Sequence, residues 1–477
     1  MLSPPPTLSA TPEQETIYGH ARGSTSNLMI NALAGTGKSH VLKHIQLRSK
    51  TRPILYLVFN RKNAVEAKSK MLSTTSVKTI NGIGQSIWTT RHPLVDKPNP
   101  NKTNQILRDL IRTVKKSLQA PMWDAFDQII SGVALAKALG YVPAGQSPIP
   151  PLLTQSSFHS HLDETPDDMV SDLIDAVLIK SISLAKLGQI DYNDQIYMPA
   201  IFGGEFPRFP LVMVDEYQDF SPINHLLLSR LVTNRLIGVG DPFQSIYAFR
   251  GANPTGMVEA TSTYSMVNLP LSISFRCPRA IVEHVHWHVP QFKALKEGGN
   301  VRIPQELPIH SLADNPTFIC RNNAPLIRLA FHLLSAGHSV SVAGIDIGYR
   351  IVALLRKLGP DTLSRAETLS AINDWEAEKL ANESKNAADL AACMRIFAHA
   401  ADSLSSAILY AEHIFAQKTG TILLMTGHKS KGLEFPDVYH LDPYLLSDTS
   451  QDRNLRYVIS TRSSNNLTEI DSDRIKW

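Results

Sequence analysis

Cysteine is scarce in this sequence, and the few that occur argue against two kinds of stabilising site. The chain contains three, Cys277, Cys320 and Cys393. An odd, scattered set makes neither a disulfide framework nor a zinc site, so it predicts reduced thiols in a cytosolic setting. Long apolar runs are also absent, since none approaches the roughly 20 residues of a membrane span. Residues 1–6 lack the charged and apolar regions of a signal peptide. We therefore expect a cytoplasmic protein with no membrane partner.

A large excess of either charge is absent as well. Lys and Arg number 47 against 43 Asp and Glu, which gives a formal net charge of +4. Such a mildly basic chain permits nucleic-acid binding but does not argue for it. The hydrophobic fraction of 43% and the charged fraction of 19% are typical of a folded globular protein. The length of 477 residues allows roughly two to four domains.

The chain does contain a glycine-rich segment, ALAGTGKSH, which is close to the phosphate-binding pattern G-x-x-x-x-G-K-[ST]. Ala32 replaces the first glycine, but Gly35 and Gly37 still allow a tight turn with inward N–H groups. We expect Lys38 to reach the β- and γ-phosphates of ATP and Ser39 to ligate Mg²⁺. The loop residues predicted to bind the nucleotide are Ala34, Gly35, Thr36, Gly37, Lys38 and Ser39.

The flanks of this segment support an ATP site over a chance glycine-rich turn. Residues 27–31 predict a strand and residues 39–45 a helix, and the helix N-terminus favours an anion. Far along the chain, the apolar run 211–214 predicts a buried strand of a parallel sheet. Asp215 follows at its carboxyl end, where ligands bind in such sheets. We expect Asp215 to bind Mg²⁺ and Glu216 to orient and deprotonate the attacking water.

The long interval between these two motifs predicts an insertion within the first domain. Strand and helix patterns alternate up to about residue 90, helical stretches then dominate, and sheet-type strands return after residue 190. A second α/β pattern begins near Met266 and is interrupted by an Ala-rich, charged, helical stretch. The predicted domains are residues 1–90 with 191–265, the insertion 91–190, residues 266–345 with 419–477, and the insertion 346–418.

A further polar and aromatic segment, GDPFQSIYAFRGA at residues 240–252, follows a predicted strand. Gln244 suits the sensing of a γ-phosphate or its water. Tyr247 and Phe249 lie close to it in sequence, and an exposed aromatic ring can stack on a base of any sequence. The pattern leaves open whether Phe249 stacks on a base or belongs to the core.

Taken together, these segments resemble superfamily 1 helicases of the UvrD/Rep/PcrA type over residues 11–470. DEYQD at residues 215–219 and the whole 240–252 segment match motifs of that family, and its phosphate loop often begins with alanine. The resemblance implies an α/β fold of two RecA-like P-loop domains with parallel sheets, each carrying a mainly helical insertion. It also implies that Gln14 contacts adenine.

The second domain resembles the same family in three segments, 271–276, 426–435 and 455–462. The resemblance implies that Phe275 packs near adenine, that Glu434 contacts the ribose, and that Arg276 and Arg462 reach the γ-phosphate. Ser274 departs from the usual asparagine. An arginine at a developing phosphate charge contributes roughly 10³–10⁵ in rate, so Arg276 and Arg462 join Lys38, Asp215, Glu216 and Gln244 as the predicted catalytic set.

The resemblance also implies a path for single-stranded DNA. Asn81 stands where relatives usually carry histidine, and Phe249 where many carry tryptophan. Phe59, Tyr247 and Phe249 are the expected stacking residues. The residues predicted to contact DNA are Phe59, Asn60, Thr79, Asn81, Tyr247, Phe249, Arg250, Thr426 and His428.

We therefore predict an ATP- and Mg²⁺-dependent helicase or translocase on single-stranded DNA, with 3′→5′ polarity implied by the resemblance. Its partners would be single-stranded and tailed duplex DNA and an accessory replication or repair protein, in the nucleoid of a bacterial or phage-infected cell. One alternative is a DNA-stimulated ATPase that remodels protein–DNA complexes or joints without unwinding. A nucleotide-binding module without catalysis is a second, against which the intact catalytic set argues.

Two other features of the sequence are not expected to form functional sites. His284, His286 and His288 alternate around Trp287, but no further ligand is apparent, so a metal site is not expected. The charged run 374–385 is interpreted as the solvated face of a helix.

Overall fold

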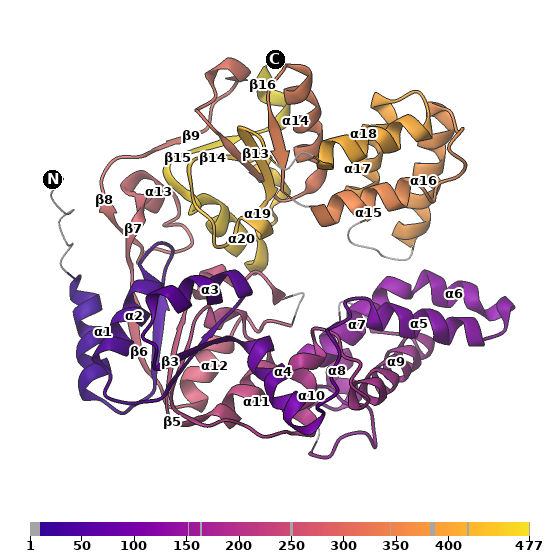
Figure 1. Ribbon diagram of the computed structural model, residues 1–477. Helices are drawn as coiled ribbons and strands as arrows, with labels where there is room; N and C mark the ends of the chain where they lie inside the picture. Colours follow the sequence, from indigo (N-terminus) through magenta and orange to yellow (C-terminus); the bar gives the residue numbers. More distant parts are fainter. Residues whose placement is uncertain are drawn as a thin grey trace. The chain divides into compact units, whose positions relative to one another are not determined.

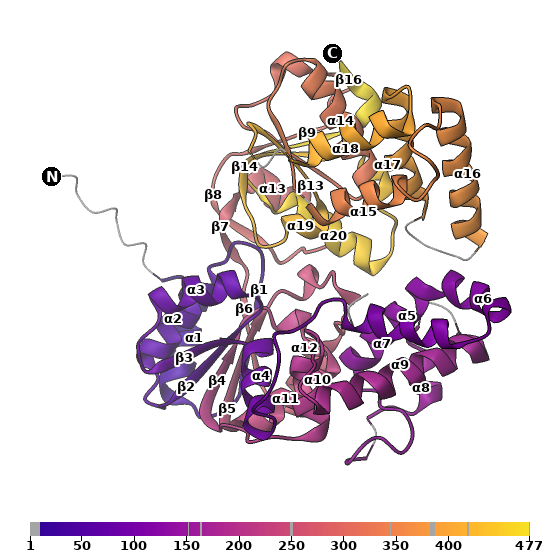
Figure 2. The same ribbon diagram turned by 45° about the vertical axis from the view of Figure 1, so that its right-hand side comes forward.

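The computed structural model describes residues 10–150, 152–162, 165–248, 251–343, 345–381, 387–416 and 419–476 (Figure 1). The chain divides into two units, Met1–Leu33 with Gly37–Ser272 and Ala34–Thr36 with Ile273–Trp477. Each unit is built on a parallel sheet with helices packed against it, as Figures 1 and 2 show. This mixed α/β architecture with parallel sheets confirms the predicted fold class.

The sheet of the first unit has six described strands in the order β3-β2-β4-β5-β1-β6, and neighbouring strands run parallel. Central strands such as β2 and β4 are continuous apolar runs because helices cover both faces. All the strands end at the same edge, so the loops after β1, β4 and β5 share that edge. The strands are β1 Leu28–Ala32, β2 Ile54–Val58, β3 Thr75–Thr79, β4 Phe209–Val214, β5 Val232–Gly240 and β6 Val267–Leu271.

Three of the helices around this sheet begin at side-chain caps. Thr11 and Gln14 form a capping box at the start of α1, while Asn60 caps α3 and Thr79 caps α4 through their side-chain oxygens. The helices are α1 Pro12–Gly23, α2 Lys38–Arg48, α3 Arg61–Lys70, α4 Ile80–Arg91, α11 Pro222–Leu231 and α12 Gly256–Thr263.

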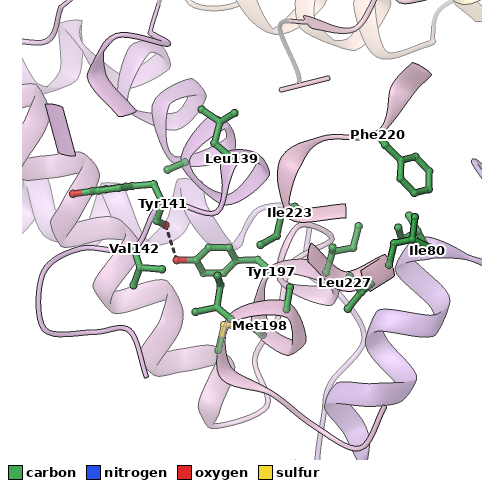
Figure 3. Close-up of a cluster of buried hydrophobic side chains, with 14 of the residues drawn as sticks. Ile80, Leu139, Tyr141, Val142, Tyr197, Met198, Phe220, Ile223 and Leu227 are labelled. Atoms are coloured by element: carbon green, nitrogen blue, oxygen red, sulfur yellow. Dashed lines mark hydrogen bonds between the residues drawn. The ribbon is translucent and has the colours of Figure 1, made fainter. Parts of the chain in front are cut away.

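Helices fill the interval between β3 and β4, as expected for an insertion. Their buried side chains merge with those of α11 into one core (Figure 3). There the Tyr197 hydroxyl donates a hydrogen bond to the carbonyl oxygen of Tyr141 at 2.8 Å. These helices are α5 Lys102–Thr113, α6 Gln119–Asp124, α7 Phe126–Leu139, α8 Gln155–His159, α9 Asp168–Lys186 and α10 Asp194–Phe202.

Two lysines and two aspartates form a buried ion cluster inside this insertion. Lys137 Nζ lies 2.6 Å from Asp191 Oδ2 and 2.7 Å from Asp194 Oδ1. Lys102 Nζ lies 2.6 Å from Asp194 Oδ2 and donates to the Ser181 carbonyl. The charges balance, which is the condition under which buried ionic groups are tolerated. The cluster joins α5, α7 and the start of α10.

The second unit has its own six-stranded sheet in the order β12-β13-β11-β14-β15-β9, again with parallel neighbours among the residues described. Two short pairs, β7 with β8 and β10 with β16, lie outside it. The strands are β7 Ile273–Pro278, β8 Lys293–Lys296, β9 Asn300–Arg302, β10 Leu307–Pro308, β11 Thr317–Cys320, β12 Val340–Val342, β13 Ile422–Thr426, β14 Phe435–Leu441, β15 Ser463–Ile470 and β16 Ile475–Lys476.

Four helices form a separate apolar core within this unit, between β12 and β13. They coincide with the helical stretch that the sequence predicts there. They are α15 Ile345–Leu355, α16 Arg365–Ala381, α17 Ala387–Ala400 and α18 Leu404–Ala416, and the remaining helices are α13 Arg279–His284, α14 Asn323–Ser335, α19 Gly427–Ser430 and α20 Ser450–Ser460.

One predicted boundary differs from the structure. The sequence pattern predicts that the second domain starts near Met266, yet β6 pairs with β1 in the first sheet, from Leu28 opposite Val267 to Ala32 opposite Leu271. A short apolar strand does not reveal which sheet it joins, because the partner is remote in sequence. No helix in the described part of the chain is long and apolar enough to cross a membrane.

Candidate functional site

The phosphate loop connects β1 to α2, as predicted. Gly35 has a φ of 69° and Gly37 a φ of 83°, in the left-handed region that glycine adopts readily. Gly37 is also the N-cap of α2, and no side chain caps this helix, as suits an N-terminus that binds an anion. Lys38 Nζ donates to the Ala32 carbonyl at 3.2 Å, and Ser39 is exposed.

The predicted carboxylates follow β4 on the same edge of this sheet. Asp215 is buried, and its Oδ2 accepts a hydrogen bond from the Tyr56 hydroxyl at 2.9 Å. Its Oδ1 accepts from the backbone N–H of Glu216 at 3.0 Å. Glu216 has a φ of 53°, which turns the chain sharply at the end of the strand. Burial, with the negative charge of Glu216, raises the pKa of Asp215 to about 6.

Glu216 and Gln244 are connected through two residues that the predicted site did not include. Gln218 Nε2 donates to Glu216 Oε2 at 2.6 Å, and Gln218 Oε1 accepts from the Asp241 N–H at 2.9 Å. Asp241 Oδ2 in turn accepts from Gln244 Nε2 at 2.7 Å. Gln218 and Asp241 lie within the motifs DEYQD and GDPFQ, so these motifs could have identified both residues from the sequence.

These residues suit Mg²⁺ held together with a nucleotide. A serine hydroxyl and a carboxylate are hard oxygen donors, and Mg²⁺ typically takes only one or two protein ligands beside phosphates and water. The raised pKa of Asp215 reflects a buried carboxylate whose negative charge is incompletely compensated within the protein. Among the residues described, no group of three or more His, Cys, Asp or Glu could hold a metal by itself.

The predicted adenine contact, Gln14, has a defined place at the start of α1. Its Oε1 accepts from the Thr11 N–H at 3.0 Å, and its own N–H donates to Thr11 Oγ1 at 3.2 Å. The next residue back, Glu13, accepts hydrogen bonds from the N–H and hydroxyl of Ser272, just after β6. The capping box therefore holds Gln14 in one conformation.

Two of the predicted base-stacking residues lie against each other. The rings of Phe59 and Tyr247 have centroids 6.1 Å apart and planes inclined by 5°. Phe59 is 37% exposed, which is unusual for phenylalanine and suits a surface that receives a base. Phe249 and Arg250, the other predicted contacts of this segment, lie outside the described residues.

The other predicted DNA contacts of this unit cap helices or join them. Asn60 Oδ1 accepts from the Asn63 N–H at 2.8 Å, and Thr79 Oγ1 accepts from the Gly82 N–H at 3.0 Å. Asn81 Nδ2 donates to the Tyr192 carbonyl at 2.8 Å and to Gln195 Oε1 at 3.0 Å. Asn81 therefore fixes α4 against the start of α10.

Sequence reasoning missed several exposed side chains beside these residues. Tyr192 is 56% exposed and adjoins Asn81 through its carbonyl. Arg61 and Lys62 are exposed at the start of α3, directly after Asn60. Arg61 and Lys62 lie close to Phe59 in the sequence, so their position could have indicated a role in binding DNA. Nothing in the sequence around Tyr192 indicates such a role.

In the second unit the structure joins two of the predicted ATP contacts. Arg276 Nε donates to Glu434 Oε2 at 2.7 Å, and the Arg276 guanidinium also donates to the Thr461 carbonyl at 3.4 Å. Phe275 is half-buried beside it. Ser274, which replaces the expected asparagine, is buried and accepts from the Cys277 N–H at 3.0 Å, so its hydroxyl stabilises the local turn.

Arg462 is a buried arginine that donates hydrogen bonds to backbone carbonyls. It is 1% exposed, and its Nε donates to the Val458 carbonyl at 2.9 Å and its Nη1 to the Leu433 carbonyl at 3.0 Å. These bonds tie the end of α20 to the segment before β14.

The remaining predicted contacts and the histidine trio also belong to this unit. Thr426 ends β13, and His428 is half-buried on α19. Each of the three histidines makes its own hydrogen-bond contact: His284 with Glu469, His286 with the Phe292 carbonyl and His288 with Asn454.

Comparison with known proteins finds matches to two UvrD-like helicase models, one in each unit. The model of the UvrD/REP helicase N-terminal domain matches residues 199–265, which contain Asp215, Glu216 and Gln244. The model of the UvrD-like helicase C-terminal domain matches residues 421–468, which contain Glu434 and Arg462. Each unit therefore contains a segment that is similar to UvrD-like helicases. This confirms the resemblance inferred from the sequence.

Similar proteins occur in a fungus and in a bacterium. F-box DNA helicase protein 1 of Schizosaccharomyces pombe is 26% identical over 489 aligned positions, which cover 91% of this chain and 53% of the relative. ATP-dependent DNA helicase PcrA of Bacillus subtilis is 28% identical over 265 positions, covering 50% of this chain and 34% of PcrA. The chain thus spans about half the length of the first relative and a smaller share of the second.

Proposed function

We propose that this UvrD-like chain is an ATP-dependent DNA helicase or translocase that moves 3′→5′ on single-stranded DNA. The observation that carries the proposal is the hydrogen-bonded series Glu216–Gln218–Asp241–Gln244 beside the phosphate loop. It connects the proposed base that activates water with the proposed sensor of the γ-phosphate. The relatives named as DNA helicases support DNA as the track.

In the proposed reaction, Glu216 accepts a proton from water as the water oxygen attacks the γ-phosphorus of ATP. The bond to the β–γ bridging oxygen breaks, and ADP and phosphate leave. Lys38 and the loop N–H groups hold the phosphates, and Ser39 and Asp215 would hold Mg²⁺, which neutralises charge on the β- and γ-oxygens when bound. Arg276 and Arg462 belong to the second unit, and the proposal assigns both of them to the γ-phosphate.

The stacked rings of Phe59 and Tyr247 support a base-binding role in the first unit. Stacking on aromatic rings contributes about 1–3 kcal/mol per base and tolerates any sequence. Tyr247 follows Gln244 by three residues, so a change at the nucleotide is transmitted over a short path to the rings. We include exposed Tyr192 and the basic pair Arg61 and Lys62 in the same proposed DNA surface.

ATP hydrolysis with and without single-stranded DNA, beside unwinding of duplexes with a 3′ or a 5′ tail, tests this proposal. We expect strong stimulation by DNA and unwinding only from the 3′ tail. Glu216→Gln should lower kcat by about 10² or more, because it removes the general base, while ATP still binds. Unwinding from a 5′ tail would refute the polarity, and absence of ATP hydrolysis would refute the enzyme.

A remodelling ATPase is the second candidate, because it would use the same predicted catalytic residues. It would show DNA-stimulated ATP hydrolysis and displacement of bound protein without strand separation. We place either activity in the cytoplasm or nucleoid, with an accessory replication or repair protein as the proposed partner.

A further inference from the structure

Tyr56 is a buried polar residue that the proposed mechanism leaves without a role. It lies in the middle of β2 and is 1% exposed. Its hydroxyl donates a hydrogen bond to Asp215 Oδ2 at 2.9 Å. The two residues are 159 positions apart in sequence, but β2 and β4 are neighbours in the sheet, with Tyr56 opposite Met213. The tyrosine therefore reaches Asp215 from the adjacent strand.

The Asp215 carboxylate is held at both oxygens. Oδ2 accepts from Tyr56, Oδ1 accepts from the Glu216 N–H at 3.0 Å, and the Asp215 N–H donates to the Leu57 carbonyl at 2.9 Å. An ionised carboxylate has about four lone-pair sites, so these two hydrogen bonds orient the group and still leave capacity for a cation. The bond from Glu216 comes from its backbone N–H, whereas the bond from Tyr56 comes from its side-chain hydroxyl. A substitution at position 56 can therefore remove one of the two bonds that orient the carboxylate.

We propose that Tyr56 is a positioning residue for Asp215, whose hydroxyl fixes the carboxylate in the orientation that binds nucleotide-associated Mg²⁺. This inference rests on the proposed function and refines its metal site. Partners that orient a metal ligand from behind typically change metal affinity by 10–100-fold when removed. Tyr56 itself touches neither the metal nor the nucleotide in this proposal.

The same core provides a control for a purely structural hydroxyl. Tyr18 on α1 belongs to the same buried cluster as Tyr56 and is also 1% exposed. Its hydroxyl has no hydrogen-bond partner among the residues described. Tyr18→Phe and Tyr56→Phe each remove one buried oxygen and keep the ring, so they differ in the contact with Asp215.

The experiment titrates Mg²⁺ against binding of a fluorescent ADP analogue to the full chain, so that no hydrolysis is involved. For Tyr56→Phe we expect the Mg²⁺ concentration at half-effect to rise about tenfold, with Mg²⁺-free binding within about twofold of wild type. Tyr18→Phe should match wild type in both. In the Asp215→Asn background, Tyr56→Phe should cause no further change, because the oriented carboxylate is already lost.

Each other outcome overturns the inference. Wild-type Mg²⁺ dependence in Tyr56→Phe, or an equal shift in Tyr18→Phe, would show that the hydroxyl serves packing alone. If Tyr56→Phe shifted the Mg²⁺ dependence further in the Asp215→Asn background, the hydroxyl would likewise serve packing alone. If Tyr56→Phe does not fold in a thermal-unfolding measurement, Tyr56→Leu takes its place with the same expectations. Failure of wild type to bind ADP or hydrolyse ATP would refute the proposed function, whereas these variants refute the positioning role while wild type remains active.

Discussion

At the scale of single residues, Glu469 on β15 shows how a buried charge stabilises the second unit. Its side chain lies 3.2 Å from His284 Nε2, 3.2 Å from an Arg456 guanidinium nitrogen and 3.5 Å from His440 Nδ1. Burial alone would raise the pKa of Glu469, but these groups outweigh it and hold the pKa well below its usual range. A depressed acid pKa stabilises the fold above the unfolded value of about 4.3, and this contribution is lost as pH falls below it.

We therefore predict that Glu469→Gln lowers the unfolding free energy by about 2 kcal/mol at pH 7, less than for a fully buried pair because Arg456 is partly exposed. In urea unfolding, the gap between wild type and variant should narrow as pH falls below about 4. Glu283→Gln, at an exposed position on α13, is the control and should leave stability unchanged. A gap that stayed constant with pH would contradict the electrostatic explanation.

At the scale of elements, the buried ion cluster determines how the inserted helices pack. Lys137 on α7 contacts both Asp191 and Asp194, while Lys102 on α5 contacts Asp194 alone. Lys137→Met would leave two buried carboxylates facing one cation, so we expect a loss of about 3–5 kcal/mol in unfolding free energy. The double variant Lys137→Met/Asp191→Asn should recover part of the lost unfolding free energy, because it removes one of the two buried carboxylates. Calorimetry of both variants, with Lys180→Met on α9 as control, provides the measurement, and a loss below about 1 kcal/mol would contradict the prediction.

The elements that sequence predicted well are those whose chemistry lies in contiguous residues. The glycines of the phosphate loop, its lysine and the apolar run before Asp215 are local patterns, and their strand–loop–helix context was found as expected. The bond from Tyr56 to Asp215 and the pairing of β6 with β1 join residues 159 and more than 200 positions apart. Sheet order decides such contacts, and neither periodicity nor a motif within one strand encodes it.

At the scale of the whole molecule, the predicted catalytic set is divided between the two units. Lys38, Asp215, Glu216 and Gln244 belong to the first, and Arg276 and Arg462 to the second. Sequence motifs predict all six, but they do not predict the partners that the second-unit arginines have in the structure. Arg276 is paired with Glu434, and buried Arg462 donates to backbone carbonyls. If both reach ATP during hydrolysis, catalysis depends on residues of the second unit.

Arg276→Ala tests that dependence directly. We expect kcat for ATP hydrolysis to fall about 10³-fold, since an arginine at the γ-phosphate stabilises the transition-state charge, while the dissociation constant for ADP at the first unit changes little. Arg276→Lys should not restore the rate, because the ammonium lacks the planar fork of donors. Arg279→Ala is the matched control: this arginine lies three residues on, is exposed and pairs with Glu297. Equal effects of the Arg276→Ala and Arg279→Ala changes, or a wild-type kcat in Arg276→Ala, would contradict the assignment of Arg276 to the γ-phosphate.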